Sequence, residues 1–323
     1  MIGQEGNLGD LSPQLREVAR SLLRDEKVDL IIGYENGSLP LRTGPCFVRS
    51  PDEAERLVWN PRCENNLATY LHRATGKVGI VAKGCDARSI VGEIVERQIA
   101  REDVVIIGVP CQGVIDRAKI EAQLDGREAL EADVSEGKIA LRGEGFEETL
   151  NLAEVLCDGC ATCRHRNPPL YDILIGEPVP EMEDADEYAA VRALEAQTAD
   201  ERWAYFANEF SRCIRCYACR EACPCCYCAE CFVDQTQPCW FGKGDDLSDV
   251  MAFHIVRAYH VAGRCLDCGA CARACPMQID LRALVKKLEK DVRELYSYEA
   301  GLHLETAPPL TTFQPDDPQE FIK

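Results

Sequence analysis

The 323-residue sequence lacks several features that define common protein classes. No apolar run reaches the roughly 20 residues that a bilayer-spanning helix needs, and no export signal is evident, so we expect a soluble, cytoplasmic protein. Positive charge is scarce: 36 Lys and Arg stand against 55 Asp and Glu, and the net charge of −19 argues against nucleic-acid binding. The G-x-G-x-x-G fingerprint of dinucleotide-binding folds follows none of the predicted strands, so the residues alone indicate no flavin site.

Cysteine, in contrast, is abundant, with 20 residues. In a long chain without an export signal, we expect these thiols to bind metal in a reducing compartment rather than to form disulfides. Two stretches, 213–224 and 265–276, share one pattern. Each has three cysteines at three-residue intervals, a fourth cysteine four residues later, and then a proline.

This pattern is typical of ferredoxins with two 4Fe-4S clusters. Close spacing lets one short loop offer three thiolates to a cluster, while the fourth cysteine, fixed by the proline, ligates the other cluster. Zinc sites more often use two C-x-x-C pairs that are far apart in the sequence. We therefore predict that each motif lends its last cysteine to the other. The predicted ligands are Cys213, Cys216, Cys219 and Cys275 for the first cluster, and Cys265, Cys268, Cys271 and Cys223 for the second.

The amino-terminal half alternates between apolar strands and amphipathic helices, which indicates βαβ units and a parallel sheet. Buried strands are predicted over 28–32, 77–82 and 103–108, the first ending at Gly33. The fold class that we predict is an α/β domain followed by a mainly α-helical two-cluster ferredoxin domain. The predicted bounds are 1–180 for the α/β domain, 181–187 for an acidic linker, 188–300 for the ferredoxin domain and 301–323 for an extended tail.

Cysteines also follow two of the predicted strands. Cys85 and Cys111 each come just after a strand, and each precedes a predicted helix. Since the carboxyl ends of parallel strands share one edge of a sheet, we expect these two thiols on the same side. A helix amino end there would favour a thiolate or an anionic cluster.

A third group of cysteines, Cys157, Cys160 and Cys163, repeats the three-residue spacing but has no fourth cysteine close by. The sheet-edge cysteines could supply the missing ligand, and Cys63 is a further candidate. A third 4Fe-4S cluster is therefore predicted here, and the sequence leaves open which cysteine is spare.

Five more cysteines lie between the two ferredoxin motifs, in residues 225–239. They could hold zinc or another iron–sulfur centre, or could form a redox-active thiol pair. We predict a metal site with Cys226, Cys228 and Cys231 as ligands, and leave Cys225 and Cys239 unassigned. In the helix predicted over 247–262, we expect His254 to be a packed core residue.

The segments 83–86 (KGCD), 108–112 (GVPCQ), 157–160 (CDGC) and 171–176 (YDILIG) occur in an order that resembles the β-subunit family of deazaflavin-reducing hydrogenases and formate dehydrogenases. The resemblance covers roughly residues 77–176. It implies FAD, one 4Fe-4S cluster and electron transfer to or from a diffusible hydride carrier. The ligands that it implies are Cys85, Cys111, Cys157 and Cys160, while Cys163 departs from the family's pattern. The carboxyl half resembles the α-helical ferredoxins of heterodisulfide reductase and succinate dehydrogenase.

If the implied FAD binds at the sheet edge, the loops after Gly33, Gly84 and Pro110 are its expected walls, because small residues let backbone N–H groups approach a pyrophosphate. The predicted function is an electron-transfer subunit of a cytoplasmic oxidoreductase complex. It would connect a hydride carrier or FAD to a partner subunit of hydrogenase, formate dehydrogenase or heterodisulfide-reductase-like type. The alternative is an adaptor subunit without flavin that carries only iron–sulfur clusters.

Overall fold

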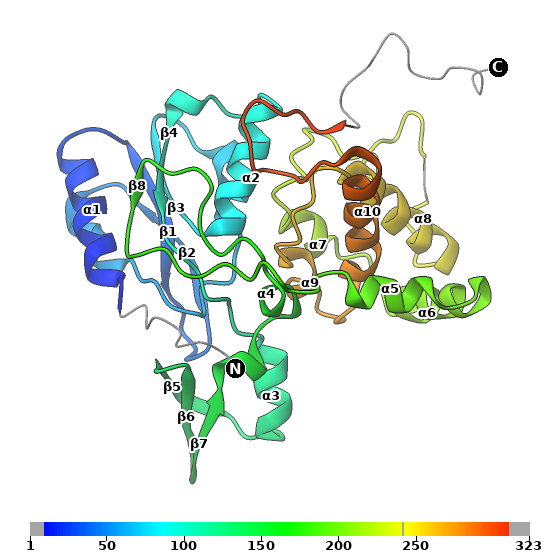
Figure 1. Ribbon diagram of the computed structural model, residues 1–323, viewed down its shortest axis with the longest axis horizontal. Helices are drawn as coiled ribbons and strands as arrows, with labels where there is room; N and C mark the ends of the chain where they lie inside the picture. Colours follow the sequence, from blue (N-terminus) through cyan, green and yellow to red (C-terminus); the bar gives the residue numbers. More distant parts are fainter. Residues whose placement is uncertain (1–9, 241, 310–323) are drawn as a thin grey trace.

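The computed structural model describes residues 10–240 and 242–309. Figure 1 shows an α/β part and a helical part side by side, with a small second sheet beneath the first part. Most of the predicted carboxyl-terminal tail lies outside the described residues, and the predicted domain bounds stay a prediction. No helix in the described ranges combines the length and the apolar composition needed to cross a bilayer.

The main sheet has five strands in the order β2-β1-β3-β4-β8. The strands β1, β3, β4 and β8 run parallel, whereas β2 is antiparallel to β1, so the sheet is mixed rather than purely parallel. Every residue of β3 is buried, as expected of a strand covered on both faces. The strand bounds are Leu30–Asn36 for β1, Thr43–Val48 for β2, Val78–Ala82 for β3, Val104–Gly108 for β4 and Ile173–Leu174 for β8.

Helices α1 (Ser12–Arg24) and α2 (Gly84–Val95) lie on opposite sides of this sheet (Figure 1). The first strand continues to Asn36, so the prediction that it ends at Gly33 is wrong. Gly33 lies in the middle of β1, where a Cβ would come within 2.5 Å of Leu57. Short 3-10 helices cover Pro51–Arg56, Leu67–Arg73 and Arg101–Asp103.

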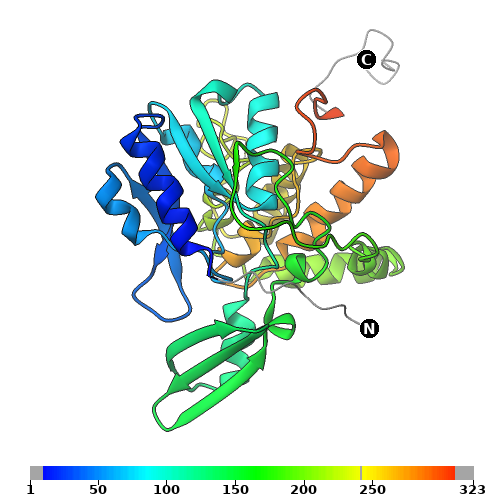
Figure 2. The same cartoon turned by 60° about the vertical axis from the view of Figure 1, so that its left-hand side comes forward.

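The second sheet is an antiparallel meander that projects away from the main sheet (Figure 2). Its core is formed by Ile139 and Leu141, which pack against Ile120 and Leu124 of helix α3. The bounds are Arg117–Leu124 for α3, Ala129–Ser135 for β5, Lys138–Gly143 for β6 and Phe146–Asn151 for β7. A 3-10 turn at Leu152–Val155 and the single-turn helix α4 (Asp158–Ala161) return the chain to the main body.

The helical part has its own apolar core, centred on Phe210 and Phe253. Helix α8 occupies the interval between the two ferredoxin motifs, and Gly263 follows it in the left-handed conformation, with φ +72°. The helix bounds are Ala189–Glu195 for α5, Ala199–Ser211 for α6, Ala218–Glu221 for α7, Leu247–His260 for α8, Ala270–Arg273 for α9 and Leu281–Tyr296 for α10.

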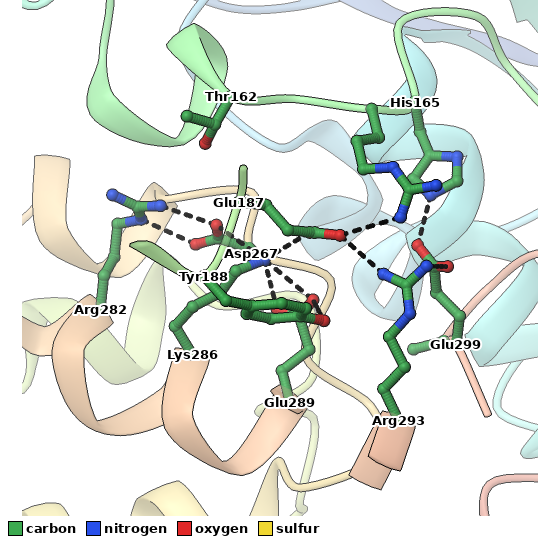
Figure 3. A network of polar contacts seen from close by, with 12 residues as sticks. Thr162, His165, Glu187, Tyr188, Asp267, Arg282, Lys286, Glu289, Arg293 and Glu299 are labelled. Carbon is green, nitrogen blue, oxygen red and sulfur yellow. Dashed lines mark hydrogen bonds and ion pairs between the residues drawn. The ribbon is translucent and has the colours of Figure 1, made fainter. Parts of the chain in front are cut away.

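A network of buried ion pairs joins the two parts of the chain (Figure 3). At its centre, Lys286 of α10 is 5% exposed. Its Nζ lies 2.8 Å from Glu187, 2.9 Å from Glu289 and 3.4 Å from Asp267. Burial alone would raise the pKa of Glu187, but the hydrogen bond from Lys286 and its other cationic neighbours hold that pKa below its usual value.

The same network reaches the α/β part through Arg164, which donates to Glu187 at 3.2 Å. Glu187 also accepts from Arg293 of α10, at 2.6 Å. Nearby, His165 contacts Glu299, a residue that also lies 3.4 Å from Arg88 of α2. The acidic segment predicted to be a linker therefore ends in Glu187, whose carboxylate pairs with cations from both parts of the chain. These ion pairs hold the two parts together.

Candidate metal centres

The two ferredoxin motifs have the same backbone shape. Arg215 and Tyr217 in the first motif, and Asp267 and Gly269 in the second, occupy equivalent positions, and all four have positive φ, between 48° and 71°. A non-glycine residue in this region costs roughly 1–3 kcal/mol, and such residues cluster at functional sites. The paired left-handed turns wrap each loop tightly, so that closely spaced cysteines can face one volume.

The second motif faces a cavity that also receives a cysteine from the first motif. The cavity is lined by Cys265, Cys268 and Cys271 together with Cys223 and Cys225, and Arg257 of α8 forms another wall. All of these cysteines except Cys225 are predicted to hold the second cluster. The prediction of crossed ligation requires the predicted ligands to lie together, and in the structure they do. Cys223 is 42 residues from Cys265 in the sequence.

The first motif packs around the aromatic core of the helical part. Cys213, Cys219 and Cys275 lie in one apolar cluster with Phe210, and the thiols of Cys213 and Cys275 are close enough to interact electrostatically. Cys216 is exposed at the surface. The last cysteine of the second motif is thus placed at the first site, which completes the exchange of fourth cysteines.

Two nitrogen atoms lie within hydrogen-bond distance of the sulfur of Cys213. The backbone N–H of Arg215 donates to it at 3.4 Å, and Nε2 of His254 lies 3.4 Å away. His254 is 4% exposed and stacks on Phe210, as expected for a packed core residue. Burial, with the charges of Arg257 and Arg215, lowers its pKa to about 4, so the ring is neutral at pH 7. Hydrogen bonds to thiolate sulfurs of this kind raise the potential of a bound cluster.

The third set of cysteines gathers at the carboxyl ends of β3 and β4. Cys85 lies in the first turn of α2, close to Cys111, and Cys111 in turn is close to Cys160 and Cys163. A hydrogen bond from the thiol of Cys157 lowers the pKa of Cys160 to about 6, which favours the thiolate form that ligates metal.

One detail of the prediction for the third set is wrong. Cys111 does not precede a helix, since α3 begins only at Arg117. Its sulfur instead accepts a hydrogen bond from the backbone N–H of Gly113, at 3.3 Å. A local N–H group therefore supplies at Cys111 the partial positive charge that was expected from a helix amino end.

The remaining cysteines divide into core thiols and neighbours of the ferredoxin sites. Cys63 is fully buried in the core of the α/β part, and burial raises its pKa to about 11. The five extra cysteines are spread out: Cys226 interacts with Cys223, Cys231 packs on the core of the helical part, and Cys228 is exposed. A metal site formed by Cys226, Cys228 and Cys231 stays a prediction.

No three His, Cys, Asp or Glu side chains in residues 10–240 and 242–309 converge as a site for a single metal ion would require. A 4Fe-4S cluster distributes its four thiolates over different irons, so its ligands surround a volume instead of sharing one point. The cavity formed by Cys223, Cys265, Cys268 and Cys271 suits this arrangement. The buried guanidinium of Arg257 in its wall suits an anionic occupant, so the donor set fits such a cluster.

The third set and the second motif are in direct contact. A Cβ on Gly159, which lies between Cys157 and Cys160, would be 3.2 Å from the carbonyl oxygen of Asp267. Arg273 spans the junction, donating to the carbonyl oxygens of Cys268, at 2.9 Å, and Glu64. The second site therefore lies between the first site and the third set, and the three cysteine groups form a chain.

The positions expected to contact FAD pack closely against other parts of the chain. A Cβ on Gly84 would lie 2.2 Å from the carbonyl oxygen of His165, so backbone packs tightly against the Cβ side of this glycine. Gly33 faces Leu57, Pro110 is buried, and the N–H that follows it, on Cys111, donates to Arg166 at 2.9 Å.

The neighbouring sheet edge is occupied as well. Lys83 is 2% exposed, and its Nζ donates to the hydroxyl of Tyr34 at 2.6 Å and pairs with Asp86 at 2.9 Å. This polar network holds Lys83 against Tyr34 and Asp86 at the edge of the sheet. The role of Gly33, Gly84 and Pro110 as walls of an FAD site stays a prediction, as does FAD itself.

We expect Gly84→Ala to destabilise the α/β part by about 1–3 kcal/mol, because the new methyl group must displace a backbone carbonyl. The displaced segment follows Cys163 directly, so about four irons per chain should be lost, as one cubane holds four. Chemical denaturation and iron analysis measure both effects. The matched control is Gly92→Ala on the same helix, where nothing lies within 4 Å of the added Cβ. Equal stability of the two variants would contradict the assigned packing.

No protein-family model matches the chain. The F420-dependent formate dehydrogenase subunit beta of Methanocaldococcus jannaschii is 23% identical, in an alignment that covers 90% of this chain and 91% of the relative. The F420-dependent formate dehydrogenase 1 subunit beta of Methanococcus maripaludis is also 23% identical, over 86% of this chain and 89% of the relative.

A solved structure of the F420-reducing [NiFe] hydrogenase complex from Methanosarcina barkeri matches 48% of this chain and 58% of its own chain, at 16% identity and a TM-score of 0.37. The chain thus spans less than two thirds of that hydrogenase chain. The relatives matched by sequence, in contrast, align along both halves of this chain. The resemblance predicted from the sequence motifs is confirmed, and this chain is similar over most of its length to the beta subunits of F420-dependent formate dehydrogenases.

Proposed function

We propose that this chain is an electron-transfer subunit of a multisubunit oxidoreductase of the F420-dependent formate dehydrogenase type. The observation that carries the proposal is the cavity lined by Cys223, Cys265, Cys268 and Cys271, which unites cysteines from both motifs. The near full-length similarity to two beta subunits supports it. In this proposal a partner subunit carries out the reaction of the terminal substrate.

The residues of the chain would hold the clusters in a row. Cys213, Cys216, Cys219 and Cys275 would hold the first, and Cys223, Cys265, Cys268 and Cys271 would hold the second. The third would be held by Cys85, Cys111, Cys157 and Cys160, with Cys163 beside them. Bound 4Fe-4S clusters supply single-electron exchange at potentials that the protein sets.

The first site is the one that opens to the surface. Cys216 is exposed, and the adjacent Ile214 is 59% exposed. We infer that a partner subunit docks over this end of the row, because solvent-exposed apolar residues beside a redox site are suited to contact with another protein.

A flavin-free adaptor is the second candidate, favoured by the backbone and side chains that fill the spaces beside Gly33 and Gly84. The first candidate keeps FAD, as the family resemblance implies. Flavin measured per chain, after mild anaerobic isolation together with the partner subunit, separates the two. Stoichiometric FAD would favour the first candidate, and absence of flavin absorbance and of releasable FAD would favour the second.

Anaerobic purification with quantified iron, sulfide and zinc tests the proposal as a whole. Three cubanes predict about 12 irons and as many sulfides per chain. About eight irons would mean that the third set holds no cluster, and about 16 would assign a further cluster to the cysteines in 225–239. Zinc in place of iron would contradict the proposal.

A further inference from the structure

Helix α8, which lies outside both cysteine motifs, places an arginine between the first and second sites. Arg257 is 4% exposed, and its Nη2 donates to the carbonyl oxygen of Cys219, a residue of the first site, at 3.0 Å. Its side chain also lines the cavity of the second site, beside Cys223 and Cys271. One guanidinium therefore contacts both sites.

Within the described ranges, no Asp or Glu lies within ion-pair distance of Arg257, and its buried Nε has no hydrogen-bond partner. The guanidinium does form a hydrogen bond with the side chain of Cys226. Arg282, which lines the same cavity, instead makes two hydrogen bonds of 2.7 Å to Asp267. A buried charge without compensation costs several kcal/mol, so an anion is expected beside Arg257.

The groups that can supply this negative charge are the cysteines. Cys223 and Cys271 line the cavity beside Arg257, and the carbonyl oxygen of Cys219 accepts its hydrogen bond. An iron–sulfur cluster held by four thiolates is an anion, and it gains one more negative charge when it is reduced. A fixed positive charge in a dry site stabilises the reduced form more than the oxidised form.

We infer that Arg257 is a positioning residue that raises the reduction potential of the second cluster, and to a smaller extent that of the first. This inference rests on the function proposed above. The effect is larger at the second site because Arg257 lines that cavity, whereas it contacts the first site only through a backbone carbonyl. The first site is also exposed at Cys216, where water screens charge.

The test is an EPR-monitored redox titration of the full chain, with iron quantified in each variant. In Arg257→Gln the signal of the second cluster should move to a more negative potential. The signal of the first cluster should move less in the same direction, and that of the third set should stay unchanged. In Arg257→Lys, which keeps the charge, the shift should be much smaller. Arg202→Gln is the matched control, because it also removes one positive charge from the helical part. Arg202 donates to the backbone carbonyl oxygens of Gln197 and Glu195, and its replacement should shift none of the cluster potentials.

The potentials and iron contents of the variants support or contradict the role of Arg257. Full iron with unchanged potentials in Arg257→Gln would overturn the inference and leave the proposed function standing. If Arg257→Gln loses the second cluster, Arg257→Lys decides: retention of the cluster near its wild-type potential supports a role for the charge, and loss of the cluster there as well would overturn it. Wild-type protein without iron would overturn the proposed function and this inference together.

Discussion

Replacing Cys223 with serine is expected to remove the cluster of the second motif, although Cys223 belongs to the first motif in sequence. Cys223 lines the cavity with Cys265, Cys268 and Cys271, so its loss leaves that cluster with three thiolates. A serine hydroxyl is a poor substitute, because the ligand must be a thiolate. Iron should fall from about 12 to about eight per chain, and the EPR signal of the second cluster should be lost or altered first.

The reciprocal variant, Cys275→Ser, is the control. Cys275 lies with Cys213 and Cys219 at the first site, so its removal should damage the first cluster and spare the second. Assigning the two EPR signals in the two variants then gives the connectivity directly. If Cys223→Ser damages only the cluster of Cys213, the crossed arrangement is wrong and each motif closes its own site.

Replacing Lys286 with methionine is expected to destabilise the protein by about 3–5 kcal/mol, which is typical of removing one partner from a buried ion pair. Methionine is close to lysine in size, so the effect measures the charge. Without that charge, the carboxylates of Glu187, Glu289 and Asp267 would face one another, with only Arg282, Arg293 and Arg164 left to compensate. Chemical denaturation of the wild-type protein and the variant, at equal iron content, measures this difference in the free energy of unfolding.

The adjacent residue provides the control for this change. Lys287 pairs with Glu195 at 3.1 Å and with Asp291, but 39% of its side chain is exposed. Lys287→Met should therefore cost no more than about 1 kcal/mol, as is usual for surface ion pairs. Similar losses in the two variants would show that the network in Figure 3 contributes no more than an exposed pair.

The sequence by itself determined the local features of this protein. The spacing of the cysteines identified two equivalent loops, and the structure gives them the same left-handed turns at Arg215 and Asp267. The apolar patterns over 77–82 and 103–108 became β3 and β4, and the helix after Cys85 became α2. Such patterns are readable because the residues that create them are neighbours along the chain.

Other features depended on contacts between distant residues. Strand β2 pairs antiparallel with β1 from Ile31 to Asn36, so β1 runs past Gly33. Leu57 and Val81 pack over the position that a Cβ on Gly33 would take. The space on the Cβ side of Gly84 is taken by the carbonyl oxygen of His165, so a glycine is needed here for two stretches of backbone to pack closely. Sequence shows that a glycine is small, but only the tertiary structure shows what occupies the space.

The surroundings of the charged side chains were the hardest feature to predict from the sequence. Glu187 lies at the end of an acidic run that looked like a solvated linker, yet its side chain is only 12% exposed and pairs with Lys286, 99 residues away. Arg257 carries no motif, and its place between two cysteine sites follows from how α8 packs between their loops. The electrostatic environment of a buried group is set by whatever the fold brings within a few ångströms of it. The tertiary structure therefore determines which charged groups lie next to the cysteines. The number and spacing of the cysteines themselves are set by the sequence.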